Sequence, residues 1–239
     1  MTNATTETDK AGLGDLAEIF YAPSAVFARR MDGKFGVPYL ALIVLGTIIY
    51  LATKGLIQPV IDAEISRAMA AAAAKNPQMT ADRVASMTSI ARAIGSFGAI
   101  GLYLIGPFLV ALLAWIAGKF FAKVEVIGTV ALMIATFSFY PRLIGNVVAA
   151  IFAAMLPEGG TLTAASISLS PARFVDVVAH PSLGQLLARF DLFVLWGVAL
   201  IAIGVRVAGK ATAKQGWTTA IVVWLVPTLL AIWGVIKNG

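Results

Sequence analysis

The chain has 239 residues, of which 59% are hydrophobic and only 13% are charged, with a formal net charge of +6. A soluble domain is about a quarter charged, so this composition indicates a protein embedded in lipid. Cysteine is absent and His180 is the single histidine, which excludes disulfides, thiol catalysis and the usual zinc and iron–sulfur sites. No basic run exceeds two residues, so we expect no nucleic-acid partner.

The N-terminal part of the chain is first polar and then amphipathic. Residues 1–12 predict a disordered tail, and residues 13–36 carry apolar side chains at helical spacing. Both signs of charge occur here and a small-residue cleavage site is missing, so we expect no cleaved signal peptide. The apolar stretch from Val37 is instead expected to act as an uncleaved signal-anchor.

Two interpretations of the amphipathic segment 13–36 remain open. It forms either an interfacial element that inserts its aromatic side chains among lipid headgroups, or a lead-in helix packed beside the bundle. Both interpretations place its aromatic side chains at the inner interface. The candidate interfacial residues are Phe20, Tyr21, Pro23, Phe27, Arg29 and Arg30.

Long apolar stretches predict an all-α fold, a polytopic bundle of about five transmembrane helices, because about 20 apolar residues cross the hydrocarbon core. The predicted spans cover residues 37–56, 94–117, 126–156, 190–207 and 217–236, all within a transmembrane domain over 37–239. Residues 57–93 form a helical outer loop. Asn76-Pro77 interrupts this loop, and Thr80 is suited to cap the helix that follows.

The third predicted span is unusually long and holds Tyr140-Pro141-Arg142 near its centre. At about 1.5 Å per residue it would reach about 45 Å, well beyond the hydrocarbon core. It is therefore one kinked helix, one helix that projects from the bilayer, or a hairpin of two half-spans. A single kinked helix is favoured, since neighbouring helices can satisfy the carbonyl that a proline leaves free.

The basic residues indicate the orientation of the chain. The short connections 118–125 and 206–216 contain two and three basic residues against one acidic residue, and three more basic residues lie just before the first span. By the positive-inside rule, the N-terminus is cytoplasmic and the C-terminus lies outside. The expected location is a cell membrane, namely a bacterial inner membrane.

Two short motifs resemble the Yip-domain family. The segment LAEIFYAPSAVFARR over 16–30 carries the pattern F-x-x-P-x-x-x-F before the first span, through Phe20, Pro23 and Phe27. The segment NPQMTADRV over 76–84 resembles a short turn of bacterial members. The resemblance covers roughly residues 13–236 and implies the same five-span fold. Eukaryotic members act in membrane traffic and bind Rab GTPases and each other, but a bacterial chain has no Rab to bind.

Arg142 is the one ionisable side chain expected deep inside a span, where a guanidinium costs a few kcal/mol unless it faces protein or water. Asp191 is the nearest carboxylate by depth, and Asn146 lies one turn beyond Arg142 on the same helix face. Two interpretations remain open: a site that binds or conducts an anion or lipid headgroup, and a structural pair between Arg142 and Asp191. The kink residues Tyr140 and Pro141 belong to the same candidate site.

Small residues predict close helix packing within the second and fourth spans. A dimer seam or a hinge at Gly106-Pro107 is the alternative. The residues concerned are Gly98, Gly101, Gly106, Pro107, Gly197 and Gly204.

The resemblance to the Yip-domain family implies a non-enzymatic membrane-organising, scaffold or trafficking-type protein. Catalytic motifs, metal-ligand sets and cofactor-binding motifs are missing, so we expect no catalytic residue, no metal and no cofactor. The expected partners are the lipid bilayer and either further copies of the chain or other membrane proteins. The alternatives are a small-solute or anion transporter or channel with Arg142 in its pathway, and an accessory subunit of a larger membrane complex.

Overall fold

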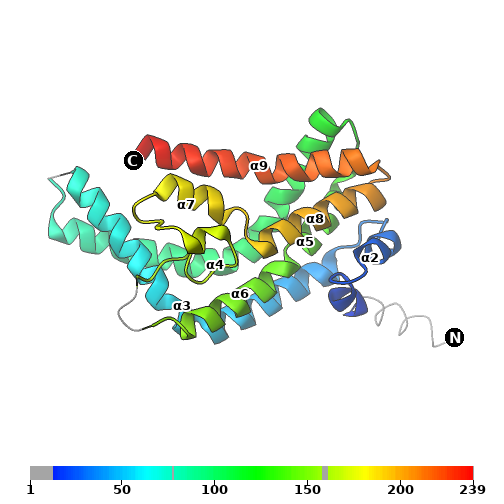
Figure 1. Ribbon diagram of the computed structural model, residues 1–239. Coiled ribbons are helices and arrows are strands. Elements are labelled where there is room, and N and C mark those ends of the chain that lie inside the picture. The colour runs from blue at the N-terminus through cyan, green and yellow to red at the C-terminus, as the bar shows by residue number, and fades with distance from the viewer. Residues whose placement is uncertain (1–12, 77, 158–160, 239) are drawn as a thin grey trace.

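The computed structural model describes residues 13–76, 78–157 and 161–238, and over these residues it contains helices and no strand. The long helices lie side by side along one direction, with the N-terminal segment at one end of the bundle and the C-terminus at the other (Figure 1). The predicted all-α bundle is confirmed. The tail predicted over residues 1–12 lies outside the described residues.

The first two long helices are much longer than a bilayer requires. Helix α3 (Gly36–Lys75) has 40 residues and α4 (Ala81–Ala117) has 37, against the roughly 20 that cross the hydrocarbon core. Thr80 caps α4 by accepting a hydrogen bond from the Arg83 amide, as the sequence predicts. The predicted outer loop is therefore two continuous helix ends, which extend beyond the other helices in Figure 1. We call residues 57–75 and 81–96 the α3–α4 arm.

The third span is one broken helix and not a hairpin. Helix α5 (Gly128–Ser138) and α6 (Tyr140–Ala154) are separated only by Phe139, and together they form one candidate span of 27 residues. Pro141 lacks an amide hydrogen and cannot bond the carbonyl of the preceding turn, which accounts for the break. The prediction of a single kinked helix agrees with this geometry.

The fourth span differs from the prediction. Helix α8 (Leu192–Val207) has only 16 residues, or about 24 Å, and is shorter than the hydrocarbon core. Helix α7 (Pro181–Ala188) precedes it at a bend of 47°. Helix α8 begins two residues after the start of the span predicted over about 190–207, because Asp191 caps it. The last helix is α9 (Ala213–Asn238). The described chain thus has four candidate spans, or five if α7 and α8 form one.

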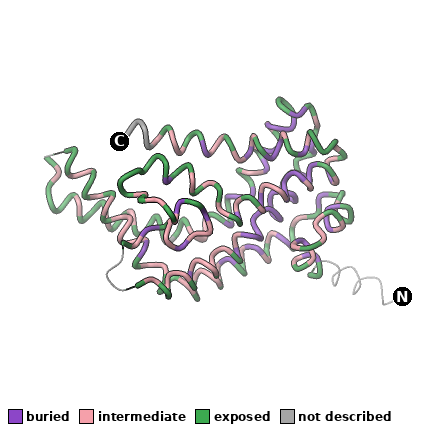
Figure 2. Tube along the Cα trace, viewed as in Figure 1, coloured by how far each residue is buried: buried purple, intermediate pink, exposed green. Residues whose placement is uncertain are grey.

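The core of the bundle lies around α5. Every residue from Val130 to Ser138 is buried, and α3, α4 and α8 pack against this helix (Figure 2). Helix α3 instead exposes most of its apolar side chains, among them Leu40, Ile48 and Leu51. Lipid is as apolar as a protein core, so such faces are stable in a bilayer.

Glycines permit close contact at some of the predicted packing positions. A Cβ atom on Gly197 would lie 2.7 Å from the Ser138 carbonyl oxygen, and one on Gly106 would lie 2.6 Å from the Phe139 ring. A Cβ on Gly204 would lie 2.8 Å from Ile134. Pro107 is buried within α4.

The packing prediction is wrong for Gly98 and Gly101. A Cβ atom on either glycine would meet no other atom within 4 Å. Both therefore lie on a surface of α4 that no described part of the chain covers.

Candidate functional site

The segment with the F-x-x-P-x-x-x-F pattern is built into the core. Ile19, Val26 and Phe27 have no exposed surface. The Phe27 ring meets that of Phe137 edge-on, with centroids 5.9 Å apart. Helix α2 (Pro23–Arg29) packs against α8. The burial of Phe27 agrees with a lead-in helix packed beside the bundle and not with an aromatic side chain inserted among headgroups. Tyr21, by contrast, is 78% exposed and is free to contact headgroups.

Phe20 and Pro23 complete this packing. Phe20 contacts the rings of Trp196 and Tyr140 edge-on, with centroids 5.5 and 6.5 Å away. Pro23 begins α2, as predicted, because its fixed φ suits a first helical turn. The Tyr140 hydroxyl donates to the Pro38 carbonyl over 2.7 Å, which joins the kinked span to α3. The motif therefore holds the N-terminal segment and two helices together.

A network of ion pairs joins the start of the N-terminal segment to the end of α2. The buried carboxylate of Asp15 accepts hydrogen bonds from Arg29 Nη2 (2.6 Å) and Arg30 Nε (2.5 Å). Glu18 pairs with Arg29 as well, and these carboxylates raise the pKa of Arg29 above its usual range. The Arg30 guanidinium lies 5.7 Å from the centroid of the Phe137 ring. We call these four charged residues the N-terminal clasp. Asp15 was not among the predicted site residues, although an acid near an Arg-Arg pair is a usable signal in the sequence.

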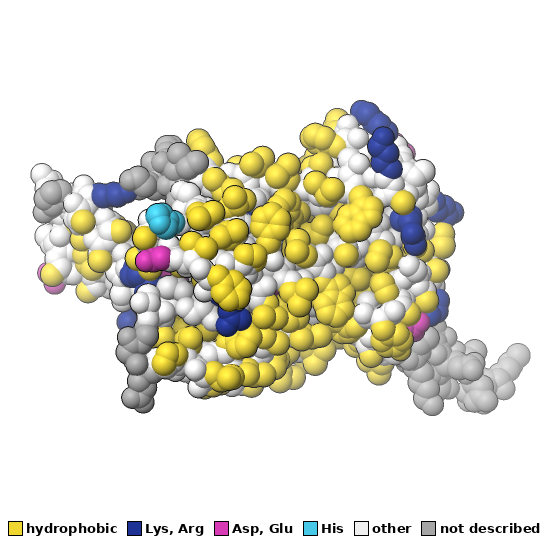
Figure 3. All heavy atoms as spheres, viewed as in Figure 1, with side chains coloured by type: hydrophobic (Ala, Val, Ile, Leu, Met, Phe, Trp, Pro, Cys, Tyr) yellow, Lys and Arg dark blue, Asp and Glu magenta, His cyan; other side chains and the backbone are white. Residues whose placement is uncertain are grey.

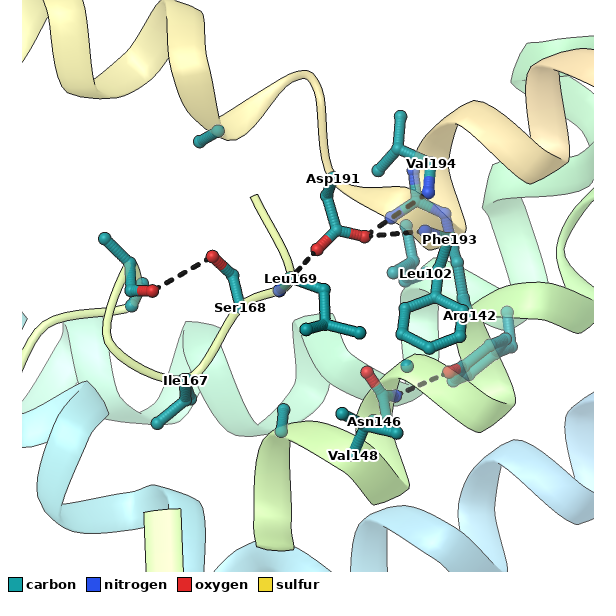
Figure 4. A pocket seen from close by; sticks show the side chains of 16 residues that line it. Leu102, Arg142, Asn146, Val148, Ile167, Ser168, Leu169, Asp191, Phe193 and Val194 are labelled. Atoms are coloured by element: carbon teal, nitrogen blue, oxygen red, sulfur yellow. Dashed lines mark hydrogen bonds between the residues drawn. The ribbon is translucent and has the colours of Figure 1, made fainter. Parts of the chain in front are cut away.

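A second candidate site is a cavity of about 330 Å³, whose lining side chains are drawn in Figure 4. Its lining elements α6, α7 and the start of α8 lie away from the N-terminal segment in Figure 1. We call it the outer pocket. It lies between α4, α6, the start of α8 and the non-helical stretch 164–169. Its polar side chains are Tyr103, Arg142, Asn146, Ser168 and Asp191. Its other walls are apolar, and include Leu102, Val148, Ile167, Phe193 and Val194.

Arg142 lines the outer pocket without an ion pair to any described residue. Its guanidinium carbon lies 5.5 Å from the centroid of the Phe139 ring, in a cation–π contact. The predicted ion pair with Asp191 is not formed, although both residues line the same cavity. The N–H groups of the Arg142 guanidinium therefore form no ion pair with a carboxylate of the described residues.

Asp191 has other partners. Its carboxylate accepts hydrogen bonds from the amides of Phe193 (2.9 Å) and Val194 (3.4 Å), which caps α8, and from the amide of Leu169 (3.0 Å). The first amides of a helix lack intrahelical acceptors, so a carboxylate at the N-cap is satisfied by them. Because these backbone amides already occupy the carboxylate, Asp191 forms no ion pair with Arg142.

Hydrogen bonds fix the rest of the pocket. The Asn146 amide donates to the Tyr103 hydroxyl over 2.6 Å and joins α6 to α4. Glu64 accepts from the Ala164 amide (2.9 Å), and Arg67 donates to the Leu162 carbonyl (2.6 Å). Both tethers hold the pocket-lining stretch against α3. No pattern in the sequence indicates these two hydrogen bonds, because the bonded residues are about 100 positions apart.

The family follows from a match over nearly the whole chain. Residues 17–236 match the model described as Yip1 domain, a range that includes both the F-x-x-P-x-x-x-F motif and the outer pocket. The chain belongs to the Yip1 domain family. No curated protein and no solved structure gives a significant match. The resemblance stated from the motifs is thereby confirmed.

Basic residues of this Yip1-domain chain gather at the end of the bundle that carries the N-terminal segment (Figure 3). They come from residues 29–34 and from the connections 118–125 and 206–214. At the same end, Lys119 lies 5.2 Å from the centroid of the Trp115 ring, and Phe120 and Phe121 are exposed. Aromatic side chains beside lysines are typical of a membrane–water interface.

Proposed function

We propose that this chain is a non-enzymatic scaffold of the cell membrane that organises other membrane components through its α3–α4 arm. The observation that carries this proposal is an apolar stripe that runs along the arm and ends at Phe97, the first residue beyond it. Met87, Ile90, Ile94 and Phe97 are exposed by 37%, 55%, 66% and 78%. No described part of the chain covers them.

The spacing of the stripe suits a helical partner. Its members are separated by three, four and three residues, the pattern of a coiled-coil seam. Met87 and Ile90 lie before the apolar stretch predicted to span the membrane over 94–117, so lipid tails are not expected to cover them. Aligned large apolar side chains outside the hydrocarbon core indicate an interaction surface.

The orientation is part of the proposal. We infer a cytoplasmic N-terminus and a C-terminus outside, as in a bacterial inner membrane. The gathering of basic residues at the N-terminal end supports this orientation through the positive-inside rule. The arm then projects on the outer side.

Filled space between the outer pocket and the N-terminal end argues for a scaffold rather than a transporter. Met133, Ile134, Phe137 and Tyr140 are fully or almost fully buried there. The N-terminal segment adds the buried Phe27 to the same core. Solute transport through the pocket would require this packing to open.

Co-purification tests the scaffold. The full chain is isolated in mild detergent, and its stable companions are compared between the native sequence, the double variant Ile90→Gln/Ile94→Gln and the control Ser89→Gln. Ser89 is exposed on another flank of the same helix. The proposal expects a companion protein, or a second copy, that the double variant loses and the control keeps. Companions unchanged in the double variant would contradict it.

Reconstitution separates the scaffold from the transporter. Proteoliposomes are tested for flux of chloride, phosphate and small organic anions, and for tubulation by electron microscopy. A scaffold moves none of these solutes at rates above empty liposomes. Anion flux that Arg142→Ala alone abolishes would overturn the proposal in favour of transport.

A further inference from the structure

We propose that the outer pocket binds a phosphate group through Arg142, a role that is independent of the scaffold function. The guanidinium lies 12 residues, or about 18 Å, before the end of α6, which is deep within the span. Arginine stays charged in proteins, and a charge at this depth needs water or an anion. No described carboxylate forms an ion pair with Arg142, so the chain itself leaves the position for the anion open.

The backbone around the pocket supports a ligand cavity at this depth. Helix α8 is too short to cross the hydrocarbon core, and its N-cap, Asp191, is bonded to the non-helical stretch at Leu169. Irregular backbone at membrane depth is tolerated where it is buried in protein or lines a polar cavity. The stretch 164–169 lines the same cavity as Arg142.

The donors suit the tetrahedral oxygens of a phosphate. The contact with the Phe139 ring orients the guanidinium plane, and its N–H groups form a fork that matches phosphate. The Tyr103 hydroxyl accepts from Asn146, so its own proton can be donated into the pocket.

Two sources offer this chemistry: the phosphodiester of a lipid headgroup and free phosphate. The cavity of about 330 Å³ has predominantly apolar walls, which suits a lipid whose headgroup enters with part of its chains. The carboxylate of Asp191 at the pocket wall disfavours a dianion more than a singly charged phosphodiester. Both arguments favour the lipid.

Thermal unfolding of the full chain in a maltoside detergent and phosphate-free buffer tests the site. The added probes are dioctanoyl phosphatidylglycerol, dioctanoylglycerol without phosphate, and inorganic phosphate. The native chain should gain about 5 °C in Tm with a saturating phospholipid and much less with dioctanoylglycerol. An equal gain with inorganic phosphate would support the site and assign free phosphate as the source.

Three variants make the test specific. Arg142→Gln removes the guanidinium, and Ala149→Leu fills the pocket but keeps Arg142. Arg206→Gln removes an arginine of α8 outside the pocket and serves as the control. The phospholipid gain should disappear in the first two variants and persist in the control. If Arg142→Gln fails to fold, the gain in Tm of Ala149→Leu with phospholipid decides whether the ligand binds in the pocket. A gain that survives in Ala149→Leu, or a native gain equal to that with dioctanoylglycerol, would overturn the proposal.

Discussion

Arg30 Nε donates to Asp15 Oδ2 over 2.5 Å, and this bond joins residues that are 15 positions apart in the chain. Asp15 thereby connects the first helical turn of the described chain to the end of α2. Because Phe27 lies between them and is fully buried, the bond also holds an aromatic side chain in the core. Residues 13–30 are therefore part of the folded bundle.

Replacing Asp15 by Asn should destabilise the protein. The Asp15 side chain is 5% exposed and that of Arg30 12%, and breaking a buried pair costs about 3 kcal/mol because the remaining charge stays buried. Intrinsic tryptophan fluorescence during denaturant unfolding measures the effect, and one of the five tryptophans, Trp196, packs on the segment through Phe20. Asp32→Asn is the control. Its side chain is 47% exposed, and its pair with Lys34 is worth less than about 1 kcal/mol. Equal losses in both variants would contradict the clasp.

Gly197→Ala should cost about 1–3 kcal/mol through overpacking, since the new Cβ would lie 2.7 Å from a backbone oxygen of α5. Gly101→Ala is the matched control, because its Cβ would meet no other atom within 4 Å. The control should leave stability unchanged or raise it by up to about 1 kcal/mol. Thermal unfolding in detergent compares the two. A larger loss for Gly101→Ala would indicate a helix partner on that surface.

Arg142→Leu should fold and insert normally, because the guanidinium has no ion-pair partner to leave behind among the described residues. A double-mutant cycle with Asp191→Asn should give a coupling below about 1 kcal/mol, as expected for residues without direct contact. Expression yield and unfolding midpoints of the four proteins provide the measurement. Misfolding of Arg142→Leu that Asp191→Asn rescues would instead establish a structural pair.

Single cysteines report on the α3–α4 arm, because the chain contains none of its own. If copies of the chain pair through the stripe, Ile94→Cys should form disulfide-linked dimers in native membranes under mild oxidation. Ser89→Cys, on another flank of α4, should form few. Non-reducing gel electrophoresis measures the dimer fraction of both variants. Equal cross-linking at both positions would exclude a defined seam, and cross-linking to a different protein would identify a hetero-complex.

Local features of the sequence predicted much of this fold. The apolar stretches predicted the membrane-spanning helices, Pro141 predicted the break between α5 and α6, and Thr80 predicted the N-terminal cap of α4. The aromatic motif indicated the family correctly. Each of these depends on residues close together in the chain, which is why the sequence alone was sufficient.

Contacts between distant segments could not be predicted in the same way. Gly197 and Gly101 occur in equally apolar helices, yet only Gly197 faces a neighbouring helix. Hydropathy does not distinguish the two, because a face toward lipid is as apolar as a face toward protein. The partners of Asp191 were missed because Leu169 lies in an irregular stretch whose path depends on tertiary contacts.

The unequal lengths of α3 and α8 have a consequence for the surrounding lipid. On α8, Leu192 and Leu195 are exposed over a helix of only 16 residues, or about 24 Å, while the exposed large apolar side chains of α3 run from Val37 to Leu56, or about 28 Å. A bilayer of uniform thickness cannot match both, so it must thin beside one side of the protein or the protein must tilt. The bilayer beside α8 is therefore expected to be a few ångströms thinner than the bilayer beside α3, unless the protein tilts.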